Sequence, residues 1–316
     1  MTDTIHRVAF VFPGQGSQAV GMGRDWYEQT DIGRALFDRA DALLGFPLSR
    51  VCFEGPEEEL RNTNRAQPGL FVCSAIVCEF LASAGVHPAV VAGHSLGEYS
   101  ALYAAGVFDL ATGLSLVRTR GEAMGQAAEA RPGAMVAVLG LDPARIEAVC
   151  AGVRSEGIVQ VANFNSPGQT VISGERQAVE RAAEAAKAAG ARRVAMLPVH
   201  GAFHSPLMQS AVPRMEAALA AAALSDPQVA FLANVEGYYL TAAPAIRASL
   251  ARQITNSVRW SDIMAGIAAT GVESVIEVGP GRVLSGLWRQ SGSPIPARPC
   301  GTVAEAKTLI SEGYGK

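Results

Sequence analysis

The sequence predicts an α/β protein with a mostly parallel sheet and a smaller, inserted α+β subdomain. Three observations lead to this fold class. Short apolar runs alternate with helix-like segments along most of the 316 residues. A strand, a tight turn and a helix meet within residues 90–105. Between residues 134 and 197 the order of predicted elements changes to β-α-β-β-α-β, which is typical of a ferredoxin-like unit.

The strand, turn and helix around residue 95 form the pattern on which the functional argument depends. The run 90–92 leads into Gly93-x-Ser95-x-Gly97, and a helix-compatible segment follows over 98–105. In such a nucleophile elbow, found in hydrolase-like cores, a strained turn lifts the serine hydroxyl clear of the sheet. The N-terminal amides of the helix stabilise negative charge beside it. We therefore predict that Ser95 forms an acyl-enzyme; the alternative is a Gly-Ser-Gly turn without chemistry.

The composition limits the classes of function. A formal charge of −3 and an isoelectric point near 6.0 argue against a polyanion-binding surface, so we expect no nucleic-acid partner. Five cysteines without a C-x-x-C pair predict a reducing, cytoplasmic environment. We also expect no signal peptide, no apolar run of bilayer length and no membrane association. We further expect no metal site, and we expect the protein to be a monomer.

A glycine-rich loop follows the first predicted strand, which covers residues 8–12. The loop, 14–18, reads Gly-Gln-Gly-Ser-Gln and has neither the third glycine of a dinucleotide-binding loop nor a Walker lysine. It nevertheless lies at the carboxyl end of a strand, where open α/β sheets bind ligands. Gln15 therefore either presents its amide to a site or belongs to a polar turn.

The other elements of the core follow from hydrophobic periodicity, caps and prolines. We predict further strands at 229–233 and 274–278. Helices are predicted over 33–44, 68–84 with Pro68 in its first turn, from the cap Asp109 to about Ala130, and over 207–223, 244–253, 261–269 and 282–288.

The inserted subdomain accounts for the change of pattern after residue 131. Its predicted elements are a strand at 134–139, a helix at 143–150, strands near 160–163 and 170–174, a helix at 177–189 and a strand at 193–197. We assign residues 132–198 to this ferredoxin-like unit and residues 1–131 and 199–316 to the hydrolase-like core. A cleft between two such units is a common place for a site.

A serine nucleophile needs a base, which is most often histidine. His94 is adjacent to Ser95, but side chains of neighbouring residues diverge on such a segment. His200 and His204 lie where the chain returns from the insertion to the core, and chemistry alone does not choose between them. Their spacing suits a helical metal pair, but Gly201 and the flanking prolines make a helix there improbable.

Arg120 lies within the predicted helix that ends at about Ala130. A single arginine on a helix most often faces solvent. The functional alternative is a guanidinium that binds a substrate carboxylate through two hydrogen bonds.

Several motifs together resemble those of malonyl-CoA:acyl carrier protein transacylases, in order from about residue 8 to 290. These motifs are Gly14-Gln15-Gly16-Ser17-Gln18, Gly93-His94-Ser95-Leu96-Gly97-Glu98, Arg120, Gly201-Ala202-Phe203-His204, Gln253 with Val258-Arg259-Trp260, and Glu277-Val278-Gly279-Pro280-Gly281.

The resemblance implies that Ser95, activated by His204, takes malonyl from malonyl-CoA and passes it to the phosphopantetheine thiol of an acyl carrier protein, supplying fatty-acid synthesis. No cofactor on the chain itself is implied. The site residues implied by the resemblance are Arg120 on the malonyl carboxylate, the backbone amides of Gln15 and Leu96 as the oxyanion hole, and a main-chain carbonyl near Gln253 that orients His204.

The four residues that end at His204 vary with the acyl group in the related polyketide-synthase domains. Phe203 resembles the malonyl form, in which the ring leaves little room for an α-methyl, although one methyl is worth only about 1 to 3 kcal/mol. Gly201 and Ser257 depart from the family pattern, the latter standing where proline often precedes Val-Arg-Trp. This leaves the strictness of malonyl selection open.

Three alternatives to a fatty-acid enzyme remain. The same chemistry could serve a polyketide synthase or a malonate decarboxylase. A serine esterase or thioesterase would need no carboxylate-binding arginine, and the inserted unit argues against it. A scaffold without activity is disfavoured by the complete set of Ser95, His204, Gln15 and Arg120.

Overall fold

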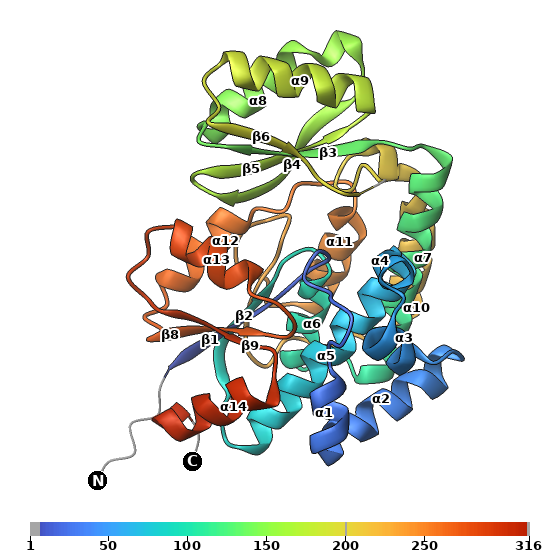
Figure 1. Ribbon diagram of the computed structural model, residues 1–316, viewed down its shortest axis with the longest axis vertical. Helices are drawn as coiled ribbons and strands as arrows, with labels where there is room; N and C mark the ends of the chain where they lie inside the picture. Colours follow the sequence, from blue (N-terminus) through green and yellow to red (C-terminus); the bar gives the residue numbers. More distant parts are fainter. Residues whose placement is uncertain (1–6, 200, 315–316) are drawn as a thin grey trace.

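Two sheets organise the computed structural model, which describes residues 7–199 and 201–314 (Figure 1). The larger sheet has the strand order β7-β2-β1-β8-β9, and the pairing of each adjacent pair is parallel. Its strands are β1 Val8–Phe12, β2 Pro88–Gly93, β7 Ala230–Leu232, β8 Ser274–Val278 and β9 Ala297–Cys300. The predicted fold class, an α/β core with a mostly parallel sheet, is confirmed.

Alternate residues of β1 enter two different hydrophobic cores. Phe10 and Phe12 pack on one face of the sheet, and Ala9 and Val11 pack on the other. Because successive side chains of a strand point to opposite faces, an apolar run of this kind requires helices on both sides. The first face is covered by α5 Thr63–Ser83, α6 Gly97–Ala104 and α7 Leu110–Ala130, and the second by α12 Trp260–Ala268 and α13 Val283–Gln290.

The remaining helices of the core surround these layers. They are α1 Arg24–Gln29, α2 Asp31–Leu44, α3 Leu48–Glu54, α4 Glu57–Arg61, α10 Val212–Ala221, α11 Ala243–Gln253 and α14 Val303–Leu309, with a 3-10 helix at Pro206–Ala211 and a helical turn at Ile310–Tyr314. The predicted cap of α7 is present, because the Asp109 side chain accepts a hydrogen bond from the Thr112 amide.

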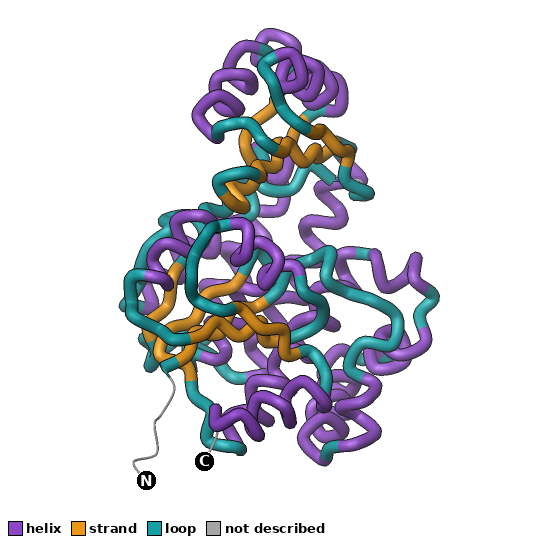
Figure 2. Tube along the Cα trace, turned by 60° about the vertical axis from the view of Figure 1, so that its left-hand side comes forward, coloured by secondary structure: helices purple, strands orange, loops and turns teal. Residues whose placement is uncertain are grey.

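The second sheet forms a lobe of its own, as Figures 1 and 2 show. Its strand order is β4-β5-β3-β6, and the pairings are antiparallel, as in a ferredoxin-like unit. The elements are β3 Ala134–Leu139, α8 Pro143–Gly152, a 3-10 turn at Arg154–Glu156, β4 Val159–Ser166, β5 Gln169–Gly174, α9 Arg176–Ala188 and β6 Arg193–Met196. Helices α8 and α9 cover one face of this sheet. The other face packs against Phe203 of the returning chain.

Helix α5 begins earlier than predicted, at Thr63, so Pro68 lies inside the helix and not in its first turn. Packing overrides the local cost of the proline, because Gly121 of α7 lets the backbone of Thr63 approach closely. The prediction that no apolar run has bilayer length was also wrong. By length and composition α5 could cross a membrane, but 72% of its most apolar window is buried inside the fold, as in a core helix.

The C-terminal part of the fold differs from the prediction in two places. The helix expected over 207–223 is divided into a 3-10 helix and α10, since Pro213 in the first turn of α10 has no amide to continue the earlier helix. Strand β9 and helix α14 were not predicted. Pro299 argues against a strand, but β9 lies at the edge of its sheet, where proline is tolerated.

Candidate active site

Ser95 lies at the sharp turn between β2 and α6. Its φ of 53° is in the left-handed region, which a non-glycine residue adopts at a cost. A Cβ added at Gly93 would overlap the carbonyl of Gly97, and one added at Gly97 would overlap the carbonyl of Phe12, so both glycines permit the close approach of strand and helix. The Ser95 amide donates to Oδ1 of Asn234, 2.7 Å away. These features place the half-buried Ser95 at the tip of the turn, as in a nucleophile elbow.

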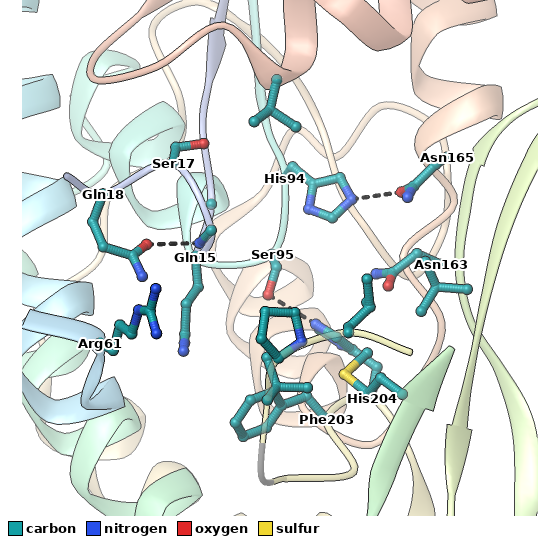
Figure 3. A pocket seen from close by; sticks show the side chains of 18 of the residues that line it. Gln15, Ser17, Gln18, Arg61, His94, Ser95, Asn163, Asn165, Phe203 and His204 are labelled. Atoms are coloured by element: carbon teal, nitrogen blue, oxygen red, sulfur yellow. Dashed lines mark hydrogen bonds between the residues drawn. The ribbon is translucent and has the colours of Figure 1, made fainter. Parts of the chain in front are cut away.

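His204 faces Ser95 from the segment that returns from the inserted unit. Its Nε2 is 2.8 Å from the Ser95 Oγ (Figure 3). Its Nδ1 contacts the carbonyl oxygens of Gln253, at 2.9 Å, and Asn256, at 3.1 Å. Carbonyls only accept, so Nδ1 carries the proton and Nε2 presents a lone pair to the serine hydroxyl. His200, the other candidate, lies outside the described residues.

The electrostatic surroundings keep His204 neutral. Burial lowers the pKa of the imidazole to about 3, and the positive charge of Arg120 acts in the same direction. His94 does not contact the Ser95 hydroxyl in this way. Its Nε2 pairs with Oδ1 of Asn165 at 2.9 Å, and its ring packs edge-on against Trp260.

Arg120 of α7 is buried, with 1% of its surface exposed, so the solvent-facing alternative was wrong. Its Nη2 donates to the Ser95 Oγ at 3.0 Å and to Oε1 of Gln253 at 2.8 Å, and its Nε donates to the same Oε1 at 3.2 Å. Within residues 7–199 and 201–314, no carboxylate forms an ion pair with it. A buried cation beside the nucleophile that has no ion-paired carboxylate can bind an anionic group of a ligand.

The predicted oxyanion-hole residues flank the nucleophile. Leu96 follows Ser95 directly and occupies the position before the first residue of α6. Gln15 lies in the loop after β1, the strand adjacent to β2, and Figure 3 shows it beside Ser95. The loop is held by a bond from the Gly16 amide to the Gln18 side chain, 2.7 Å long. The role of the two backbone amides stays a prediction.

These residues border a cavity of about 510 Å³ between the two sheets. The core contributes the loop after β1, Ser95 and Arg120, whereas the ferredoxin-like unit contributes Met135 and Asn163. Phe203 also lines it, together with His204, and both are labelled in Figure 3. No group of three metal-ligating side chains occurs in the described part of the chain.

The two departures from the expected motifs have structural reasons. A Cβ at Gly201 would come within 2.6 Å of the Phe203 ring, so the glycine leaves room for the ring in its present position. The Ser257 hydroxyl donates to the carbonyl of Val161, 2.6 Å away, and so connects the core to β4.

Sequence reasoning missed three polar residues that hold the site. Asn234 donates to the Gly93 carbonyl as well as accepting from Ser95. Glu98, fully buried, accepts from Asn234 and Gln253, and Gln160 of β4 donates to the carbonyls of His204 and Thr255. The signal for Asn234 was its place just beyond a strand on the carboxyl edge of the parallel sheet.

Comparison with known proteins agrees with this geometry. Residues 9–303 match the acyl transferase domain family. The malonyl CoA-acyl carrier protein transacylase of Bacillus subtilis (strain 168) is 45% identical over 285 residues, which is 90% of each chain. The structure of an acyl carrier protein S-malonyltransferase from Vibrio cholerae has a TM-score of 0.93 at 41% identity, covering 96% of this chain and 99% of that one.

A further solved structure contains a malonyl-transacylase in complex with its holo type II polyketide synthase acyl-carrier protein. It has a TM-score of 0.93 at 39% identity and covers 97% of this chain and 99% of that chain. The protein is thus an acyltransferase: it belongs to the acyl transferase domain family, among the malonyl CoA-acyl carrier protein transacylases.

Proposed function

We propose that this protein transfers malonyl from malonyl-CoA to the phosphopantetheine thiol of a holo acyl carrier protein, through a malonyl-Ser95 intermediate. The position of Arg120 carries the proposal. Its guanidinium is buried, lacks a carboxylate partner among the described residues and lies 3.0 Å from the Ser95 Oγ. The free carboxylate of a malonyl thioester is one carbon from the reacting carbonyl. Arg120 can therefore bind the carboxylate while Ser95 attacks the carbonyl.

In the first half-reaction the Ser95 Oγ attacks the thioester carbonyl and its proton moves to Nε2 of His204. The negative charge of the tetrahedral intermediate lies against the backbone amides of Gln15 and Leu96. The carbon–sulfur bond then breaks, and the leaving thiolate of coenzyme A takes the proton from His204. The products are malonyl-Ser95 and free coenzyme A.

In the second half-reaction the phosphopantetheine thiol loses its proton to His204 and attacks the malonyl-serine ester. Collapse of the new intermediate breaks the Ser95 ester bond, and Ser95 recovers the proton. The ion pair with Arg120 holds the acyl group inside a cavity that a thiol arm enters, which favours transfer over hydrolysis. The cofactor-like arm belongs to the carrier protein, so the chain needs no cofactor of its own.

We place the product in fatty-acid synthesis, as the source of malonyl extender units. The specific alternative is a polyketide carrier protein, since one relative is seen in complex with such a partner. Transfer rates from malonyl-Ser95 to purified holo carrier proteins of both pathways, measured in competition, separate the two.

The first experiment is acyl labelling of the purified protein. Malonyl-CoA, acetyl-CoA and methylmalonyl-CoA are incubated with it separately, the reactions are quenched in acid, and peptide masses are measured. We expect a malonyl adduct on the Ser95 peptide that is absent in Ser95→Ala and is removed by holo acyl carrier protein. Arg120→Ala should lose malonyl labelling by about 100-fold while acetyl labelling stays within a few fold, because only malonyl carries the carboxylate. Hydrolysis of simple esters without acyl labelling would instead identify a serine esterase.

A further inference from the structure

The side chain of Gln253 lies between a cation and a carboxyl group at the centre of the site. Its Oε1 accepts two hydrogen bonds from Arg120, at 2.8 and 3.2 Å. Its Nε2 donates to the carbonyl of Ser95 at 2.8 Å and to Oε2 of Glu98 at 2.5 Å. Gln253, Arg120 and Glu98 are all buried. Every polar atom of this amide is therefore in use, without help from solvent.

The two orientations of an amide have the same shape but exchange its donor and its acceptor. If Gln253 were turned over, its NH₂ group would face the N–H groups of Arg120, and its oxygen would face two acceptors, the Ser95 carbonyl and Glu98. The second oxygen of Glu98 already accepts the Asn234 amide, at 2.8 Å. Glu98 thus presents Gln253 with a second acceptor beside the Ser95 carbonyl, and the two acceptors together fix the orientation in which Oε1 holds Arg120.

The chain Glu98–Gln253–Arg120 positions the guanidinium without neutralising it. A direct ion pair with a carboxylate would hold Arg120 equally well, but it would neutralise the positive charge that the substrate carboxylate needs. Because the neutral amide stands in between, Glu98 does not contact the guanidinium, and the face of Arg120 toward Ser95 stays available. We propose that Glu98 is a positioning residue for acyl selection, which acts through the Gln253 amide to hold Arg120 for the substrate carboxylate. This inference rests on the proposed function of Arg120.

The variant Glu98→Gln tests the proposal with almost no change of volume. Its oxygen can keep the bond to the Asn234 amide, but its NH₂ then faces the NH₂ of Gln253 and forces that amide to turn or to separate. We expect the ratio of kcat/KM for Ser95 loading from malonyl-CoA over acetyl-CoA to fall about tenfold or more, mainly through a higher KM for malonyl-CoA. The rate of Ser95 modification by an uncharged sulfonyl fluoride should stay within about twofold, since His204 is not contacted by Glu98.

Glu236→Gln is the matched control. Glu236 is a nearby carboxylate that accepts from Ser249 and pairs with Arg252, and it bonds to neither Gln253 nor Arg120. It should leave the malonyl to acetyl ratio unchanged. If Glu98→Gln does not fold, Gln253→Met removes the amide while keeping the main-chain carbonyl that orients His204. It should lower the same ratio, and an unchanged ratio in a folded Gln253→Met would overturn the proposal.

A double-mutant cycle with Arg120→Ala separates this inference from the proposed function. If Glu98 acts through Arg120, Glu98→Gln leaves the ratio unaltered once Arg120 is absent. If Glu98→Gln still lowered the malonyl to acetyl ratio in the absence of Arg120, the positioning role would be contradicted. It would also be contradicted if Glu98→Gln lowered sulfonyl fluoride reactivity as much as malonyl loading. An Arg120→Ala variant that keeps its malonyl preference would instead refute the proposed function.

Discussion

Ser95 and His204 share a backbone property that sets them apart from other side-chain-bearing residues. With φ values of 53° and 57°, they are the non-glycine residues with positive φ in the described ranges 7–199 and 201–314. Such conformations cost of the order of 1–3 kcal/mol each and concentrate at functional sites. The surrounding bonds hold both residues, Asn234 at the Ser95 amide and Gln160 at the His204 carbonyl. Strain at these two positions thus supports the nucleophile and base proposed here.

The pH dependence of Ser95 reactivity is the prediction that belongs to these residues. Because burial and Arg120 lower the pKa of His204 from 6.5 to about 3, the base stays unprotonated in mildly acid solution. We expect the rate of modification by an uncharged sulfonyl fluoride to be nearly constant from about pH 8 down to about pH 5. With a base of ordinary histidine pKa, the modification rate would fall to half near pH 6.5. Such a profile would contradict a buried base that stays neutral.

The lowered pKa of His204 also makes the free energy of unfolding depend on pH, and proton linkage gives the direction of this dependence. In the unfolded chain His204 binds a proton near pH 6.5, whereas the fold excludes that proton until about pH 3. The unfolded state therefore gains protons first, and stability falls as the pH drops from 6.5 toward 3. The modification rates are accordingly measured only where circular dichroism shows the protein to be folded.

At the scale of elements, the elbow depends on close backbone contact between β2, α6 and β1. A Cβ at Gly97 would overlap the carbonyl of Phe12 at the end of β1, and backbone cannot move away as a flexible side chain can. We predict that Gly97→Ala lowers the melting temperature and removes Ser95 labelling by malonyl-CoA.

Gly125→Ala is the control for this substitution. Gly125 lies inside α7, and beyond the backbone of its own helix an added Cβ would have open space around it to 4 Å. Alanine there should raise the free energy of unfolding by roughly 0.5–1 kcal/mol and leave labelling intact. Equal effects of the two alanines in thermal melts and labelling would show that the elbow does not need its glycine.

The sequence was sufficient for elements whose pattern is local. The bounds of β1, β3 and β8 agree with the predicted strands, because apolar runs between glycine or proline signals define them. It failed where tertiary contacts override a local signal. Pro68 indicated a helix that begins near residue 68, but α5, packed against Gly121, begins at Thr63. Pro299 argued against a strand, but it lies in the edge strand β9.

For the whole molecule, the residues that carry the proposed chemistry were more predictable than the residues that hold them in place. Ser95 could be selected by its motif, but local chemistry left Arg120 between a solvent-facing and a carboxylate-binding role and left His200 and His204 equal, so that the family resemblance decided both. Glu98, Asn234 and Gln160 come from separate parts of the chain, and single amides or carboxyls carry no spacing pattern. Only the three-dimensional structure, in which the two sheets border the same cavity, shows that these residues lie together beside the nucleophile and the base.

The inserted sheet reaches the base through Gln160, and this connection gives the last prediction. The Nε2 of Gln160 in β4 donates to the carbonyls of His204, at 2.7 Å, and Thr255, at 3.1 Å, holding the strained base near its own acceptors. Gln160→Met should lower kcat about tenfold and change the KM for malonyl-CoA by less than about twofold, since Arg120 is not touched. Gln177→Met, the same replacement at an exposed position of α9, should change neither constant. A rise in KM without a fall in kcat would mean that the inserted sheet shapes the acyl pocket and does not position His204.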